Sequence, residues 1–346
     1  MQVYYAAGHQ PYHPKHSFFT GRFTPYPDVP ARADALLAAI QSRPGYDLMT
    51  PPALGEGTGD DTVQDAALGA AHDPAYLEAL RDLCTRLKDD EAFYPFHMAG
   101  HALLAQSPYP RLRVGQYALD GATPLLRTSW AAALSAAESA LAASHAVAGG
   151  AREAYALCRP PGHHAGRALY AGYCLLNNAA LAALALLPLG RVAVLDVDYH
   201  HGNGTQDIFW EREEVFYASL HCHPREAYPY VTGAAEERGS GAGLGGNLNL
   251  PLPGGTDWAA YAPALETALE AIAAHRPAVL VLSLGFDTLE SDPIGSFALR
   301  RPDYRAMGQR IRQLNLPTVL VQEGGYHVEA LQDCLTNFLD GWEAGT

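Results

Sequence analysis

The chain has 346 residues, of which 48% are hydrophobic and 17% are charged, a composition typical of a globular protein with a large core rather than of a disordered chain. Its 23 Lys and Arg against 37 Asp and Glu give a net charge of −14, which argues against a nucleic-acid-binding protein built on a basic face. The five cysteines include no pair with CxxC spacing, so we expect neither a disulfide framework nor a cysteine-based zinc site. The N-terminus lacks the pattern of a secretory signal, and the most apolar stretch, 179–189, has about half the length of a membrane span. We therefore predict a cytoplasmic protein with neither a nucleic-acid nor a membrane partner.

The first 125 residues contain many Pro, Gly and Tyr residues and show little periodicity. We expect long loops here, and two Tyr- and Pro-rich segments, 9–30 and 89–110, are too long and too aromatic for ordinary surface loops. One hypothesis is that these segments fold back on the core of their own chain. The other is that they form an interface with a second copy.

From residue 129 onward, short apolar runs alternate with Ala- and Leu-rich helical patterns. The runs are β-branched and apolar on both faces, as buried parallel strands are. This alternation, with no linker or repeat, predicts an α/β protein with a single domain, 1–346, in which helices flank both faces of an open parallel sheet. The predicted strands cover 153–158, 191–197, 214–220, 278–284 and 318–322, and the predicted helices cover 129–147, 175–187, 258–274, 303–314 and 328–339.

Polar and ionisable side chains follow each predicted strand. The carboxyl ends of parallel strands meet at one edge of an open α/β sheet, where ligands bind, so we expect one active site at that edge. A single DxD or HH pair commonly belongs to a solvated loop and a Gly-Gly-Tyr to a turn, so the prediction depends on their joint occurrence. The residues concerned are His163, His164, Asp196, Asp198, His200, His201, Ser219, His221, Asp287 and Tyr326.

The pattern DVDYH favours a metal site. Alternate side chains of an extended segment point the same way, so Asp198 and His200 can converge on one ion, with Asp287 completing the set. Two carboxylates and one imidazole suit Zn²⁺, with Fe²⁺, Mn²⁺ and Co²⁺ less favoured. A bound metal lowers the pKa of its water toward about 7, and either His163 or His164 could act as the base for that water.

Tyr326 adds a neutral hydrogen-bond donor for the oxyanion that develops on an attacked carbonyl. The glycines before it, Gly324 and Gly325, allow the backbone to approach closely. Together with the metal pattern, this predicts metal-assisted hydrolysis.

The motifs RPPGHHA, GYCLLNNAA, DVDYHHGNGTQDIF, SLH, GFDT…DP and EGGY together resemble the arginase/deacetylase superfamily. More narrowly, the chain resembles the bacterial acetylpolyamine amidohydrolases, relatives of the class II histone deacetylases. The motifs run from Arg159 to Tyr326, and GRFTPYPDVPARADALL and HDPAYLEALRD also match. The resemblance implies the arginase/deacetylase fold and a zinc enzyme, with Fe²⁺ or Co²⁺ as alternatives, that removes acetyl groups from acetylated polyamines, diamines and small acetyllysine-like amines. It also implies a homodimer whose loops narrow the substrate channel.

Roles for individual residues follow from the resemblance. His164 would be the general base, hydrogen-bonded to Asn203, and His163, oriented by Asp196, would assist as an electrostatic catalyst or acid. Tyr326 would polarise the acetyl carbonyl. The implied zinc ligands are Asp198, His200 and Asp287.

The resemblance also implies residues around the catalytic set. Gly172, Tyr173 and Tyr228 would line an aromatic tunnel, and Arg32 would lie near the path by which acetate leaves. A structural K⁺ would be held by side chains of Asp196 and Ser219 and by carbonyls of Asp198, His200 and Leu220. A second carbonyl-lined site would lie around Phe209, Arg212 and Val215.

The chain departs from the polyamine pattern at the tunnel mouth. The position of an acidic gatekeeper is Ile294, and Asp120 and Glu91 are the nearby acids that could substitute for the expected ones. Three further positions that carry acids in the polyamine pattern are not acidic here: Ser17, Val114 and Ala122.

Three alternatives remain: a protein lysine deacetylase, a catalytically inactive module that binds acylated amines, and an arginase-type dinuclear manganese enzyme. The intact ligand set, the paired histidines and Tyr326 disfavour the inactive module. The single DxDxH and the tyrosine donor disfavour the arginase type. The sequence does not rank acetylated amines against peptide acetyllysine.

Overall fold

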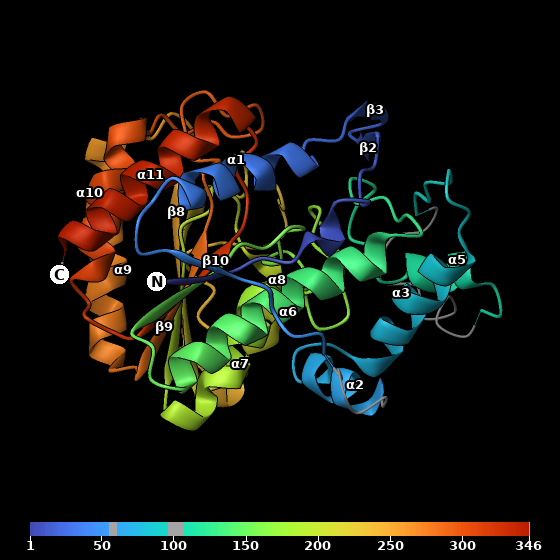
Figure 1. Cartoon of the computed structure of the whole chain (residues 1–346), viewed down its shortest axis with the longest axis horizontal. Helices are drawn as coiled ribbons and strands as arrows, with labels where there is room; N and C mark the ends of the chain where they lie inside the picture. The colour runs from blue at the N-terminus through green and yellow to red at the C-terminus, as the bar shows by residue number, and fades with distance from the viewer. Residues whose placement is uncertain (55–60, 96–106, 346) are drawn as a thin grey trace.

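The computed structural model describes residues 1–54, 61–95 and 107–345. Its main sheet has eight strands in the order β4-β1-β5-β10-β9-β6-β7-β8, and all of its pairings are parallel (Figure 1). The predicted open parallel sheet is therefore confirmed. The strands are β1 (Gln2–Tyr4), β4 (Asp47–Met49), β5 (Glu153–Ala156), β6 (Val192–Asp196), β7 (Val215–Cys222), β8 (Asn247–Leu252), β9 (Val279–Leu284) and β10 (Thr318–Gln322).

The central strands are apolar on both sides because they serve two cores. In β6, Val192 and Val194 join one hydrophobic cluster, whereas Ala193 and Leu195 join the other. The period of two residues thus sends successive side chains to opposite faces. The first face is covered by α6 (Ser129–Ala148), α7 (Asn178–Leu186) and α8 (Asn203–Phe209), and the second by α1 (Pro30–Gln41), α9 (Trp258–His275), α10 (Arg301–Arg312) and α11 (Val328–Ala344) (Figure 1).

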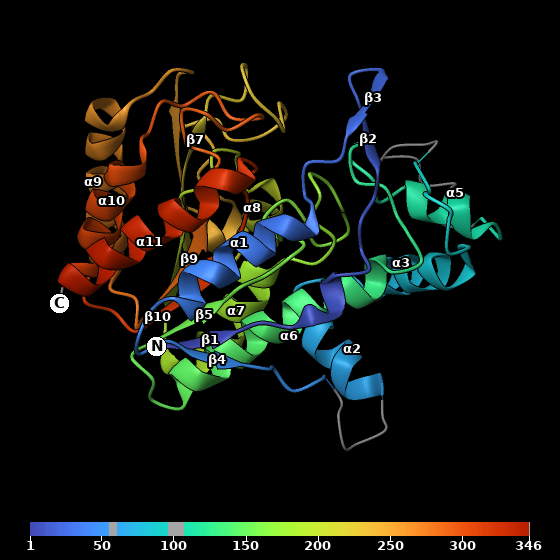
Figure 2. The same cartoon turned by 45° about the horizontal axis from the view of Figure 1, so that its top comes forward.

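The first 125 residues are more regular than we expected. They supply β1 and β4 at the sheet edge and α1 on one face, and α2 (Asp61–Gly69), α3 (Pro74–Arg86) and α5 (Pro110–Gly115) lie to the side of the sheet (Figure 2). A local signal for α3 was present, because Asp73 caps the helix by accepting a hydrogen bond from an amide at 2.8 Å and Pro74 follows it.

The Tyr- and Pro-rich segment 9–30 contains an antiparallel hairpin of β2 (His16–Phe19) and β3 (Arg22–Pro25), which stands away from the main sheet (Figures 1 and 2). Residues 96–106 of the second segment, 89–110, lie outside the described residues. In the part of the chain that is described, no helix combines the length and the apolar character needed to cross a membrane.

Candidate active site

The strand ends converge as the parallel topology requires. Asp196, at the end of β6, pairs in register with Ser219 on β7 and Ser283 on β9. Asp287 follows β9, and the turn that ends at Tyr326 follows β10. The structure thus brings the side chains predicted for the active site to one edge of the sheet.

Asp198, His200 and Asp287 face one another, and their ligand atoms lie within 4.8 Å of each other. All three residues are buried. Nδ1 of His200 lies 3.0 Å from Oδ2 of Asp287 and 3.4 Å from Oδ1 of Asp198. A Cβ atom on Gly324 would lie 2.5 and 2.6 Å from oxygens of the two carboxylates, so the backbone of the β10 turn requires glycine there.

The electrostatics of this set fit a cation. Burial, followed by the negative charge of Asp198, raises the pKa of Asp287 to about 7. Two buried carboxylates at this spacing repel each other, and a divalent ion would neutralise them. The three side chains therefore fit a divalent metal, and oxygen and imidazole ligands in this ratio suit zinc and its first-row neighbours.

His163 is held in its protonated form. Its Nδ1 lies 3.1 Å from Oδ2 of Asp196, and its Nε2 lies 3.7 Å from Oδ1 of Asp198. Burial alone would lower the pKa of His163, but the charges of Asp198 and Asp196 outweigh it and raise the pKa to about 10. The hydroxyl of Tyr217 donates to the same oxygen of Asp196 at 3.0 Å, which fixes the carboxylate that orients His163.

His164 has the opposite preference. Its ring centroid lies 4.1 Å from that of His163, and burial, together with the positive charges of His163 and His200, holds the pKa of His164 well below its usual value. Nδ1 of His164 lies 2.7 Å from Oδ1 of Asn203, which is an acceptor, so Nδ1 carries the proton. The Nε2 atom of neutral His164 is then free to accept a proton.

Tyr326 is anchored through its backbone and its ring. Oδ2 of Asp292 accepts a hydrogen bond from the Tyr326 amide at 2.6 Å, and the guanidinium of Arg32 lies 4.5 Å from the ring centroid. Arg32 also donates to the carbonyl oxygens of Glu323, at 2.7 Å, and Gly325. Burial raises the pKa of Tyr326 well above its usual value, so the hydroxyl remains a proton donor.

A cavity of about 700 Å³ reaches these groups, and His164, His200 and Tyr326 contribute to its wall. Gly172 has a φ of +52°, and a Cβ atom there would lie 2.2 Å from the ring of His164, so this position requires glycine. The wall also contains every residue predicted for the tunnel: Gly172, Tyr173, Tyr228, Ile294 and Asp120.

Asp120 and Glu91, the two acids expected near the entrance of the tunnel, lie in different places. Asp120 is buried on the wall, where it accepts hydrogen bonds from the Tyr228 hydroxyl at 2.6 Å and the Gly172 amide at 2.9 Å. Glu91 pairs with Arg111 and is not part of the cavity wall formed by the described residues. Of the two acids, the described structure therefore places Asp120, and not Glu91, on the wall.

Two side chains implied for a potassium site, those of Asp196 and Ser219, belong to residues that pair in register on β6 and β7. Asp196 accepts a hydrogen bond from the Asp198 amide at 3.2 Å, and Oγ of Ser219 lies 2.8 Å from Nδ1 of His221. The ring of His201 lies against that of His221, with centroids 4.6 Å apart and planes tilted by 54°, and His201 is not on the cavity wall formed by the described residues. His201 and His221 thus belong to a buried polar cluster that does not contribute to the cavity wall, unlike His164.

Several residues of the site were not assigned from the sequence. Glu323 is buried and accepts hydrogen bonds from the amides of Gly162 at 2.7 Å and His163 at 3.1 Å, so it holds the histidine loop in place. Its position in EGGY, directly after an apolar strand, was the available signal. Asp292 lies in the GFDT…DP motif, whereas Glu226 carried no comparable signal. The β2–β3 hairpin, which also contributes to the wall, lies in the segment 9–30, where we expected loops that narrow the channel.

Comparison with known proteins establishes the class. The family described as "Histone deacetylase domain" matches residues 26–342, and the chain belongs to this family. Enzymes of the family are metal-dependent deacetylases, in agreement with the Asp-His-Asp set.

Within this family, the chain is similar to several acetylpolyamine amidohydrolases over its full length. The chain is 42% identical to "Acetylpolyamine amidohydrolase 1" of Pseudomonas aeruginosa and 40% identical to the "Acetylpolyamine amidohydrolase" of Mycoplana ramosa, in each case over 99% of both chains. A crystal structure of an acetylpolyamine aminohydrolase from Burkholderia pseudomallei superposes with a TM-score of 0.90 at 39% identity, covering 100% of this chain and 99% of that one. The resemblance seen in the motifs is thereby confirmed.

Proposed function

We propose that the protein is a zinc-dependent amidohydrolase that removes acetyl groups from acetylated polyamines, diamines and other small cationic acetylamines. The observation that carries the proposal is the juxtaposition of the Asp-His-Asp set, neutral His164 and protonated Tyr326 at one aromatic-lined cavity. The names of the full-length relatives support an acetylated polyamine as the substrate. The whole chain would act as one deacetylase domain, with a structural K⁺ behind the zinc ligands.

The proposed mechanism uses each group in turn. The metal held by Asp198, His200 and Asp287 would supply Lewis acidity toward the acetyl carbonyl and lower the pKa of water. His164 accepts a proton at Nε2 as a water oxygen attacks the carbonyl carbon, and Tyr326 donates a hydrogen bond to the carbonyl oxygen as negative charge develops.

Collapse of the tetrahedral species then breaks the C–N bond. A proton from the histidine pair passes to the nitrogen, so the products are acetate and a free amine. His163, with its raised pKa, keeps a positive charge beside the reacting centre and stabilises the negative charge on the substrate.

A substrate panel tests this function. We expect kcat/KM for acetylputrescine, acetylspermidine and acetylcadaverine to exceed that for intact acetylated histone, with small acetyllysine peptides between them, because a slim amine enters the cavity more easily than a folded protein. Metal content is measured in the same samples. Equal rates on acetylated protein would favour the protein lysine deacetylase, and no hydrolysis by the metal-loaded protein would favour the inactive binding module.

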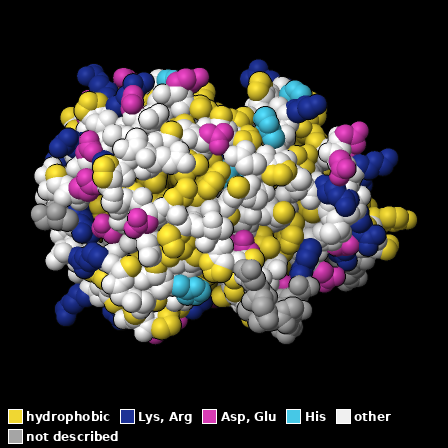
Figure 3. Space-filling model, in the orientation of Figure 1, with side chains coloured by type: hydrophobic (Ala, Val, Ile, Leu, Met, Phe, Trp, Pro, Cys, Tyr) yellow, Lys and Arg dark blue, Asp and Glu magenta, His cyan; other side chains and the backbone are white. Residues whose placement is uncertain are grey.

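We also infer that the protein forms a homodimer through the β2–β3 hairpin. Phe23 at the hairpin is 60% exposed, and its ring packs against Phe18 and Tyr94, with centroids 5.0 Å apart in each case. In the space-filling view the hairpin projects beside a notch in the surface, with hydrophobic side chains exposed near it (Figure 3). Apolar area of this kind is typical of protein interfaces.

Sedimentation velocity at micromolar concentration should therefore show a dimer, and Phe23→Asp should shift it toward monomer, because a charge in the apolar contact remains unpaired. Leu244→Asp is the matched control, since Leu244 is 71% exposed but lies just before β8. A wild-type protein that sediments only as a monomer would contradict the dimer.

A further inference from the structure

Within the described part of the chain, two carboxylates line the cavity that ends at His164 and Tyr326: those of Asp120 and Glu226. Asp120 is 8% exposed, and its oxygens accept hydrogen bonds from the hydroxyl of Tyr228 and from backbone amides. Because its lone pairs are engaged within the wall, Asp120 positions the tunnel rather than presenting a charge to a ligand. Glu226 is therefore the carboxylate of the wall that remains open to a ligand.

Glu226 is exposed yet held in place. Its Oε2 accepts a hydrogen bond from the Gly254 amide at 2.9 Å, and its own amide donates to the His223 carbonyl at 2.8 Å. No described Lys or Arg lies within ion-pair distance of its carboxylate. A fixed carboxylate without a cationic partner, on the wall of a cavity, is suited to bind a cation that the substrate brings.

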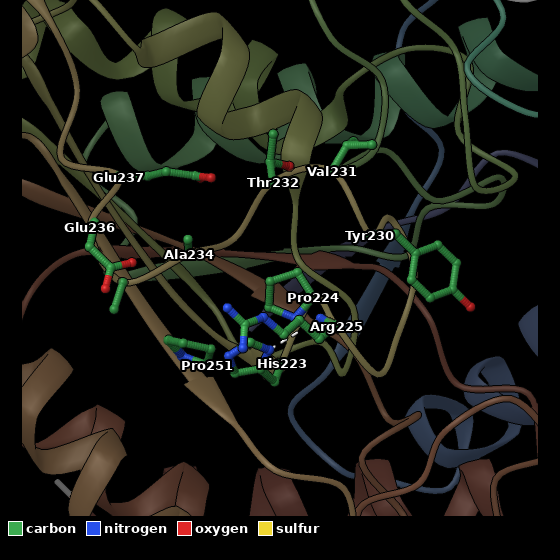
Figure 4. Close-up of a pocket in the computed structure, with 11 residues that line it drawn as sticks. His223, Pro224, Arg225, Tyr230, Val231, Thr232, Ala234, Glu236, Glu237 and Pro251 are labelled. Carbon is green, nitrogen blue, oxygen red and sulfur yellow. Dashed lines mark hydrogen bonds between the residues drawn. The ribbon is translucent and has the colours of Figure 1, made fainter.

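The residue before Glu226 in the chain, Arg225, faces a different space. Arg225 lines a neighbouring hollow of about 350 Å³ together with Glu236 and Glu237, whereas Tyr230 contributes to the walls of both spaces (Figure 4). Segment 223–230 therefore separates the two spaces and directs Glu226 to the cavity. Because Arg225 is directed to the hollow, it does not neutralise Glu226.

We propose that Glu226 determines the specificity of the enzyme for cationic amines, by pairing with the distal ammonium of a substrate whose acetyl group lies at His164 and Tyr326. The inference rests on the proposed function and adds to it the residue that recognises the charge. Arg22, from the β2–β3 hairpin, also lines the cavity and would instead favour an anionic tail, so the two residues predict opposite substrate preferences.

The test compares Glu226→Gln with wild type on two substrates of equal length: acetylputrescine, which carries a distal ammonium, and the neutral N-pentylacetamide, in which a methyl group replaces that ammonium. The amide oxygen of Gln can still accept the hydrogen bond from Gly254, so the variant removes the charge and keeps the anchor. We expect kcat/KM for acetylputrescine to fall roughly three- to fivefold, the range of a partly exposed ion pair. The kcat/KM for N-pentylacetamide should stay within about twofold, and added salt should reduce the difference between wild type and variant on acetylputrescine.

Glu236→Gln is the matched control, because it removes the same charge from the neighbouring hollow and not from the cavity. Glu236→Gln should leave kcat/KM for both substrates unchanged. If Glu226→Gln and Glu236→Gln lose kcat/KM for acetylputrescine equally, the effect is that of the long-range electrostatic field and not of a local contact. If Glu226→Gln loses kcat/KM equally on both substrates, Glu226 stabilises the loop and does not recognise the charge. Either result, or no loss at all in Glu226→Gln, overturns the inference.

Failure of the proposed function can be distinguished from failure of the inference about Glu226. A wild type that hydrolyses neither substrate would remove the proposed function and this inference with it. A wild type that hydrolyses both substrates but prefers N-acetyl-γ-aminobutyrate to acetylputrescine would keep amide hydrolysis and overturn the role of Glu226 in favour of Arg22.

Discussion

Dialysis against a chelator should abolish deacetylation, and added Zn²⁺ or Co²⁺ should restore it. Asp198, His200 and Asp287 are the protein groups that would hold the ion, and without it nothing in the site supplies Lewis acidity to the amide carbonyl. Activity and metal content are measured on the same dialysed sample. Full activity of protein verified as metal-free would exclude the mechanism.

Asp287→Ala should reproduce this loss genetically. The variant removes one of the three protein ligands. Replacing a group that only supports a ligand already costs about 10- to 100-fold in metal affinity or activity, so we expect metal affinity and activity to fall by at least about 10²-fold. Asp257→Ala is the control. Asp257 caps α9 through the Ala260 amide at 3.1 Å, so its loss costs about 1 kcal/mol of stability and leaves the metal in place. An Asp287→Ala variant with normal metal content and rate would contradict the assignment of this ligand.

Tyr326→Phe should bind metal normally and lose about 10²- to 10³-fold in kcat, the usual cost of removing one oxyanion donor. The substitution keeps the ring, and with it the contact to Arg32 and the edge-on contact to Tyr173 at 5.7 Å. The backbone anchor on Asp292 is also unchanged. A loss in kcat therefore reports on the hydroxyl and not on packing.

Tyr199→Phe is the matched control for this experiment. Tyr199 lines the same cavity, but its hydroxyl is 2.8 Å from Oγ of Ser296 and serves the wall. We expect at most a small change in kcat for this variant. If Tyr326→Phe behaves like Tyr199→Phe, then Tyr326 is an aromatic plug of the turn and the carbonyl is polarised by another group.

The sequence alone was sufficient for the five central strands, β5, β10, β9, β6 and β7, and for the set of residues at their carboxyl ends; β1, β4 and β8 were not predicted. Strand β6 was predicted at 191–197 and lies at Val192–Asp196, and β10 was predicted without error at 318–322. These predictions succeeded because a strand buried on both faces needs a continuous apolar run, which is a local property. Because all the strands of the main sheet are parallel, the polar residues that follow them meet at one edge.

The tertiary structure decided what the local pattern does not contain. Strands β1 and β4 have three residues each, too few for a visible period, and β1 pairs with β5, about 150 residues away in the chain. The position of the acids also depends on the fold: of the two acids that nearness in sequence suggested, Asp120 lies on the cavity wall and Glu91 pairs with Arg111, and the fold adds Glu226 to the wall.

The division of labour between the two histidines also depends on the fold. His163 and His164 are neighbours in the chain with identical side chains, so the residues alone left either as the base. Asp196 and Asp198 come from the end of β6 and raise the pKa of His163, whereas Asn203, at the start of α8, gives His164 a neutral partner. Local sequence determines which groups reach the sheet edge, but the charge on each depends on burial and on neighbours that only the folded chain brings within hydrogen-bonding distance.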